Sequence, residues 1–270
     1  MSILGWVISI AVGASAFAWF ASLLTNDTSW VDRLWSIVPW VYIVVFAHGA
    51  HWHDARLNLM AALTTAWGLR LTFNFARKGG YTGVEDYRWE VLRGRMTKLQ
   101  FQLFNLFFIV LYQNALLVLI ALPALTAFQH PGRPLGGLDY LVGLLFVLCL
   151  AGETVADQQQ WNFHQRKAAA VAAGASMEPG FLNTGLFRFS RHPNYFFEIS
   201  QWWLVYAFGA VAAGSLMQWT VLGAVLLTIL FVGSTRFTEE ISSAKYPQYA
   251  QYQRTTSAVI PWFPRTGRRA

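Results

Sequence analysis

The residues best suited to chemistry lie in a short polar segment, residues 191–198, of a chain otherwise rich in apolar residues. Pro193 has no amide proton and a fixed φ, so it suits the first turn of a helix. The start of such a helix presents free amide groups and the positive end of the helix dipole. Arg191 and His192 stand directly before it, and the segment is therefore suited to binding a phosphate group.

Amide and acidic side chains continue along the same predicted helix. Asn194, Glu198 and Gln201 are spaced i, i+4 and i+7, and therefore share one helix face. A carboxylate one turn into an otherwise apolar helix needs a partner, which is either a buried cation or an amide of a ligand. The sequence leaves both possibilities open. It also leaves open that Arg191 and His192 are ordinary anchors at a membrane surface.

Three further polar clusters accompany this segment. One contains Glu153 and Asp157 at helical spacing, another is residues 236–240, and the third is residues 85–89. Glu153 and Asp157 also have a plainer interpretation, as a solvated helix end that pairs with the cations at positions 166 and 167. All four clusters fall at the same end of the predicted helices, so a single pocket could gather them.

The elements that must position these residues are long apolar segments. Of 270 residues, 55% are hydrophobic and 12% are charged, whereas soluble domains carry about 25% charged residues. This composition excludes a disordered chain and a nucleic-acid binder. We expect an all-α, polytopic integral membrane protein with about seven transmembrane helices, because seven runs are continuously apolar and most approach the roughly 20 residues that cross a bilayer. The runs are 3–24, 34–50, 57–76, 103–125, 138–156, 199–213 and 216–234.

The formal net charge of +7 is distributed unevenly along the chain. If seven helices cross the bilayer, all 20 Lys and Arg residues except Arg56, Arg70 and Arg133 fall in loops on one side. The positive-inside rule then places the N-terminus outside and the C-terminus in the cytoplasm, with the polar clusters on the cytoplasmic face. We expect the Ala-rich residues 168–175 to be a flexible connection there, and residues 1–270 to form a single membrane domain.

The C-terminal half resembles a known family. Residues 184–198 read TGLFRFSRHPNYFFE, which resembles the signature of the steroid 5α-reductase-like membrane proteins, and of their bacterial branch in particular. Three further features support this resemblance: the pair Glu153 and Asp157, residues 85–89, and the Tyr-x-x-Tyr spacing of Tyr246 and Tyr249. The resemblance covers about residues 65–265 and is strongest over 150–265. It implies a fold shared with sterol reductases and with isoprenylcysteine or phospholipid methyltransferases.

The resemblance implies hydride transfer from NADPH to an activated C=C bond of a lipid-soluble enone, a steroid or another lipid, at the cytoplasmic membrane face. It implies that helices within 1–125 hold the hydrophobic substrate and that residues 138–265 bind the cofactor. It also implies an integral protein of a bacterial inner membrane, with the lipid bilayer as its partner. The residues it assigns to NADPH are Glu153, Asp157, Arg188, Arg191, His192, Asn194, Tyr195, Glu198, Arg236, Glu239 and Tyr246.

The residues that would activate the substrate carbonyl do not carry over from the family. Steroid 5α-reductases use a Tyr and a Glu on early helices, but the tyrosine position falls near Trp67 and the first glutamate here is Glu85. Asp32, Tyr42 and Tyr87 are the candidates to replace them, and the sequence does not choose among the three.

Two other functions stay open. Residues 236–240 and the Tyr-x-x-Tyr spacing are also similar to the tail of S-adenosylmethionine-dependent prenylcysteine or phospholipid methyltransferases. A non-catalytic membrane protein or transporter is disfavoured, because the polar residues crowd one face rather than line a path across the membrane. His51 and His53 stand apart on the opposite side, so we expect no metal site.

Overall fold

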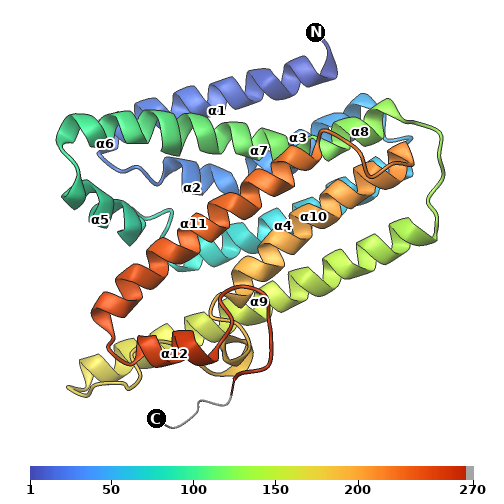
Figure 1. Ribbon diagram of the computed structural model, residues 1–270. Coiled ribbons are helices and arrows are strands. Elements are labelled where there is room, and N and C mark those ends of the chain that lie inside the picture. The colour runs from blue at the N-terminus through green and yellow to red at the C-terminus, as the bar shows by residue number, and fades with distance from the viewer. Residues whose placement is uncertain (266–270) are drawn as a thin grey trace. The chain divides into compact units, whose positions relative to one another are not determined.

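The computed structural model describes residues 1–265, and these residues are helical with connecting loops (Figure 1). Within them, extended backbone pairs only at an isolated parallel bridge between Ser190 and Ser257. The expectation of an all-α protein is confirmed. The helices are α1 (Ile3–Thr25), α2 (Trp30–Trp35), α3 (Val38–Gly49), α4 (Ala55–Arg77), α5 (Tyr87–Arg95), α6 (Lys98–Phe104), the π-helix η1 (Asn105–Tyr112), α7 (Gln113–Ala121), α8 (Pro123–Gln129), α9 (Gly137–Ala172), the 3-10 helix η2 (Gly185–Arg188), α10 (Pro193–Ala213), α11 (Val221–Lys245) and α12 (Tyr249–Thr255).

Within residues 1–265, five helical stretches are long and apolar enough to cross a membrane. They are Ile3–Thr25, Trp30–Gly49, Lys98–Gln129, Gly137–Ala172 and Val221–Lys245. Helices α4 and α10 cover the two other expected runs and are 23 and 21 residues long, with more polar residues along them. The chain thus has the helices of a membrane-embedded protein, while the count of seven and the orientation stay predictions.

Two helix boundaries test how well local sequence signals place the elements. Helix α10 begins at Pro193, as expected from the fixed φ of proline. Helix α9 does not end near residue 156 but runs for 36 residues to Ala172. The expected flexible connection at 168–175 is therefore wrong for its first five residues. Alanine has the highest intrinsic helix propensity, so an Ala-rich stretch extends a helix that already exists.

The chain forms two compact units. The first, called the N-terminal unit, comprises Met1–Phe146 and Trp202–Leu227, and the second, the C-terminal unit, comprises Val147–Gln201 and the chain from Thr228. Helices α9, α10 and α11 each contribute residues to both. Each unit is described by itself below.

The N-terminal unit is built on α3, which packs against α4, α7 and α1. Its core includes the fully buried Tyr42 and Phe46, and Trp67, whose ring meets that of Trp202 edge-on at 4.8 Å between centroids. A Cβ on Gly68 would lie 2.2 Å from the Trp40 ring, so only glycine allows this approach of α3 and α4. Close packing through small residues is how helices associate in lipid, where apolar burial gives little driving force.

Candidate functional site

The segment that the sequence singled out is held in the C-terminal unit by a bidentate ion pair. The guanidinium of Arg191 donates to both carboxylate oxygens of Glu239, at 2.6 and 2.9 Å. Its Nη1 donates to the backbone carbonyls of Gln253, at 3.0 Å, and Thr256. Both side chains of the pair are about one-tenth exposed. Arg191 therefore has most of its donors committed to α11, to the last turn of α12 and to the residue that caps α12.

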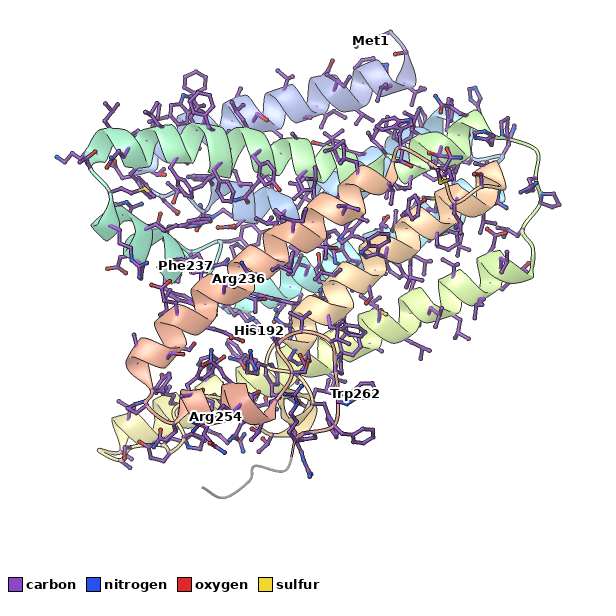
Figure 2. The ribbon with its side chains drawn as sticks, viewed as in Figure 1. Met1, His192, Arg236, Phe237, Arg254 and Trp262 are labelled. Atoms are coloured by element: carbon purple, nitrogen blue, oxygen red, sulfur yellow. The ribbon has the colours of Figure 1, made fainter. Side chains whose placement is uncertain are left out.

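His192, which is labelled in Figure 2, contacts the same carboxylate. Its Nε2 lies 3.2 Å from the Glu239 carboxylate, and its ring stacks on that of Tyr195 at 5.0 Å between centroids. Tyr195 in turn meets Phe231 of α11 edge-on at 4.8 Å. The histidine and tyrosine thus fix the first turn of α10 against α11. We call Arg191, His192, Glu239 and Gln253 the Arg191 cluster.

The chain after α12 lies along the segment that precedes α10. The amides of Arg191 and His192 donate to the carbonyls of Ser257 and Ala258, at 2.8 and 3.0 Å. The Ser190 hydroxyl donates to the carbonyl of Val259 at 2.7 Å. The Tyr252 hydroxyl donates a hydrogen bond to the carbonyl of Phe187. Burial raises the pKa of the Tyr252 phenol, so it stays protonated and keeps this bond.

Acidic side chains of α9 and α10 are buried in the same unit. Glu153 accepts a hydrogen bond from Nε2 of Gln201 at 2.7 Å. Glu153, Asp157 and Glu198 are each at most 5% exposed, so the interpretation as a solvated helix end does not describe the two on α9. The ammonium of Lys167 donates instead to the Gly180 carbonyl and the Tyr246 hydroxyl, both at 2.7 Å.

A cavity of about 540 Å³ opens on the side of α9. Five of its lining residues carry polar side chains, and one of these, Arg166, is an exposed arginine. The cavity is lined by Gln159, Asn162, Gln165, Arg166, Leu182, Thr184 and Gly185. A volume of this size lies within the range of small-molecule and cofactor sites.

Gly185 and Gln159 shape one wall of the cavity. Gly185 has a φ of +64°, and a Cβ there would lie 2.5 Å from Oε1 of Gln159. That same oxygen accepts the amide of Leu186 at 2.9 Å, which keeps the glutamine in place. Sequence reasoning did not assign these lining residues. Their signal is the spacing of Gln159, Asn162 and Arg166, which repeats at three and four residues and so marks one helix face.

The other residues expected to bind the cofactor differ in how exposed they are and in what they contact. Arg188 is the last residue of η2, and its side chain is exposed. The first residue of η2, Gly185, lines the cavity. Arg236 is exposed on α11, and Asn194 is half-buried in the first turn of α10. Tyr246 contacts two cations, with the Lys167 and Lys245 ammonium groups 4.8 and 5.6 Å from its ring centroid.

The three candidates for carbonyl activation belong to the N-terminal unit and differ sharply. Asp32 accepts the indole N–H of Trp89 at 3.0 Å, and Tyr87 is 51% exposed. Tyr42 is fully buried, and its hydroxyl has no hydrogen-bond partner within residues 1–265. A buried hydroxyl without a partner is costly, so it is the one of the three that a ligand oxygen would stabilise.

The cluster at residues 85–89 fixes a loop. Glu85 accepts the amide and hydroxyl of Thr28, at 2.8 and 2.7 Å, and both terminal nitrogens of Arg93, at 3.0 and 2.8 Å. Burial opposes ionisation, but these hydrogen bonds outweigh it and lower the pKa of Glu85. No group of three or more His, Cys, Asp or Glu side chains arranged to hold a metal occurs among the described residues.

Comparison with known proteins identifies relatives whose activity is undescribed. A family model described as "protein of unknown function (DUF1295)" matches residues 18–256. A Schizosaccharomyces pombe protein described as uncharacterized is 38% identical over 274 residues, covering 96% of this chain and 79% of the yeast protein. No solved structure matches.

Proposed function

Because the chain belongs to the DUF1295 family, described as of unknown function, we propose its activity from its own site. The activity is NADPH-dependent reduction of an activated C=C bond in a lipid-soluble enone. The observation that carries the proposal is the cavity on α9, with its polar walls and exposed Arg166. The resemblance to steroid 5α-reductase-like proteins supports the choice of cofactor.

The lining residues fit the polar parts of a dinucleotide. The amides of Gln159, Asn162 and Gln165 can both donate to and accept from ribose hydroxyls and base edges. Arg166 presents a planar fork of donors that suits a phosphate. Unlike that of Arg191, its guanidinium makes no hydrogen bond to the described part of the chain, so these donors are available. We therefore assign anion binding to the cavity, and we assign the Arg191 cluster to holding the fold of the C-terminal unit.

When bound, NADPH would supply the hydride for the reduction. The protein must hold the acceptor and polarise its carbonyl. We assign the polarising role to the buried Tyr42 hydroxyl, which can donate to a carbonyl oxygen and lacks another partner in residues 1–265. The apolar helices of the N-terminal unit provide surroundings that a lipid-soluble substrate enters readily.

The membrane placement belongs to the proposal as well. We propose seven spans, an external N-terminus and a cytoplasmic C-terminus, because the basic residues concentrate on one side. NADPH would then reach the C-terminal unit from the cytoplasm. The same proposal places the protein in a bacterial inner membrane, with residues 1–125 as the substrate part and 138–265 as the cofactor part.

Calorimetry on the detergent-purified protein tests the cofactor. We expect NADPH to bind and S-adenosylmethionine not to bind. Arg166→Ala should weaken NADPH binding about 10- to 100-fold, since a hydrogen bond to a charged group contributes about 1.5–3 kcal/mol. Arg254→Ala is the matched control, because Arg254 is an exposed arginine of the same unit outside the cavity, and it should bind as the wild type does.

The opposite ligand preference would overturn the proposal. Binding of S-adenosylmethionine without NADPH would support the methyltransferase alternative, and binding of neither would contradict both. If NADPH binds, the Tyr42→Phe variant separates cofactor binding from enone reduction. It should leave the affinity for NADPH unchanged and lower the rate of enone reduction, because the phenylalanine ring keeps the packing and removes the donor.

A further inference from the structure

The last described residues carry large apolar side chains on the protein surface. Ile260, Trp262 and Phe263 are 67%, 70% and 78% exposed. Trp262 lies at the outer edge of the C-terminal unit (Figure 2). We call residues 260–263 the aromatic tail. A surface that exposes several adjacent large apolar residues marks an interaction site more often than single exposed residues do.

The aromatic tail is held in a fixed position. The amide of Trp262 donates to the carbonyl of Phe189 at 2.9 Å, and the amide of Arg265 donates to the carbonyl of Thr255 at 2.8 Å. The ring of Phe263 meets that of Phe189 edge-on at 6.1 Å between centroids. The backbone immediately before the tail is bonded to residues 190–192, as described above. The exposure of the tail is therefore a feature of the fold.

Basic residues flank the aromatic tail and acidic residues are missing from it. Arg188, Arg254 and Arg265 are all exposed. In the sequence no Asp or Glu follows Glu240, whereas that stretch has Lys245, Arg254, Arg265, Arg268 and Arg269. The surface thus combines apolar side chains with positive charge. This combination is typical of protein segments that lie in the headgroup region of an anionic bilayer.

We propose that the aromatic tail docks on the anionic lipid surface of the membrane that holds the helices. Trp262 and Phe263 insert at the boundary between headgroups and acyl chains, and the arginines pair with lipid phosphates. A lipid surface fits better than a protein partner, because tryptophan and arginine are favoured at that boundary. The described residues also include five helical stretches long and apolar enough to span a bilayer, which is the membrane that the tail would contact.

Spin labelling of the full chain in nanodiscs tests the docking. Cys149 is the single cysteine, so Cys149→Ser provides a background for one new cysteine. Trp262→Cys places a nitroxide on the tail, and Ala250→Cys, at an exposed position of α12, is the matched control. In discs of equal parts phosphatidylcholine and phosphatidylglycerol, the label at 262 should collide with oxygen more than with a water-soluble nickel chelate. The label at 250 should show the reverse.

The lipid charge and the arginines sharpen the test. Each basic residue near an anionic surface changes the embedded-to-exposed ratio about fivefold. Arg254→Gln, Arg265→Gln or discs of phosphatidylcholine alone should therefore lower that ratio at position 262. A label at 262 as open to nickel as the one at 250 would overturn the proposal. So would a label shielded from both reagents, because protein and not lipid would then cover the tail.

Discussion

An arginine–carboxylate pair is buried in each unit of the molecule, and the two pairs differ in what surrounds them. In the N-terminal unit, Arg56 donates to Asp139 at 2.6 and 3.0 Å, and both side chains are 1% exposed. Asp139 also accepts the amide of Gly136 at 2.9 Å. In the C-terminal unit, Arg191 and Glu239 make a similar bidentate pair that His192 and Gln253 join.

The two pairs differ in what they connect, and neither of them leaves its arginine free to bind a ligand. Arg56 and Asp139 connect the start of α4 to the start of α9, and the other hydrogen bonds of the Arg56 guanidinium go to the carbonyls of Arg133 and Pro134. The Arg191 pair instead lies where residues 253–258 are bonded to the segment before α10. In both, the arginine is committed to the fold. Arg166, exposed at a cavity, is the contrasting case, and being near a polar cluster does not by itself make an arginine a ligand residue.

Breaking the fully buried pair should have the largest effect. Asp139→Asn leaves Arg56 buried without its counter-charge, and removing one partner of a buried pair costs about 3–5 kcal/mol of stability. Thermal unfolding in detergent measures the loss. Arg56→Met with Asp139→Leu removes both charges and should regain most of it. Unfolding of Asp139→Asn at the wild-type temperature would show that the pair is not structural.

Breaking the second pair should cost less, because it is partly exposed. Glu239→Gln should destabilise the protein by about 1.5–3 kcal/mol, the contribution of a hydrogen bond to a charged group. The amides of Arg191 and His192, which are bonded to residues 257 and 258, should exchange with solvent faster. Glu90→Gln, at an exposed position of α5, is the control and should change neither quantity. Equal exchange in both variants would contradict the assigned role.

The cavity wall gives a smaller and more local effect. Gly185→Ala places a methyl group against Gln159 and strains a residue with φ +64°. Gly174→Ala is the matched control, because its φ is +75° and nothing lies within 4 Å of the added methyl. Each should lose about 1–2 kcal/mol of stability from backbone strain. Only Gly185→Ala should also weaken NADPH binding, by about tenfold or more. Equal affinities would show that this wall does not contact the ligand.

Replacing Glu85 should change the stability least, and the change should depend on acid pH. The pKa of the Glu85 carboxyl is lowered in the folded state by Arg93 and Thr28, against the opposing effect of burial. Its contribution is therefore complete above the ordinary glutamate pKa and is lost as pH falls through the lowered value. Exposed pairs contribute about 1 kcal/mol or less. Stability measured against pH should fall less steeply at acid pH in Glu85→Gln, and parallel curves would contradict the assignment.

The sequence predicts the helices better than the contacts between them. Apolar runs and a proline mark where helices lie, because these signals act within one or two turns. Arg191 and Glu239 are 48 positions apart, and Ser190 and Val259 are 69 apart. No local sequence pattern predicts which distant carboxylate or carbonyl will accept a hydrogen bond from a given arginine or serine. The polar residues 191–198 and 236–240 therefore mark where the Arg191 cluster lies, but not which of their donors and acceptors the fold uses.

Hydrogen exchange with and without NADPH tests the central proposal most directly, because it locates the ligand on the chain. The proposal predicts slower exchange in peptides covering residues 159–166 and 182–188, which line or adjoin the cavity. Peptides of the Arg56–Asp139 region should not change. Protection of the cavity peptides by S-adenosylmethionine instead of NADPH, or no protection there by NADPH, would contradict it.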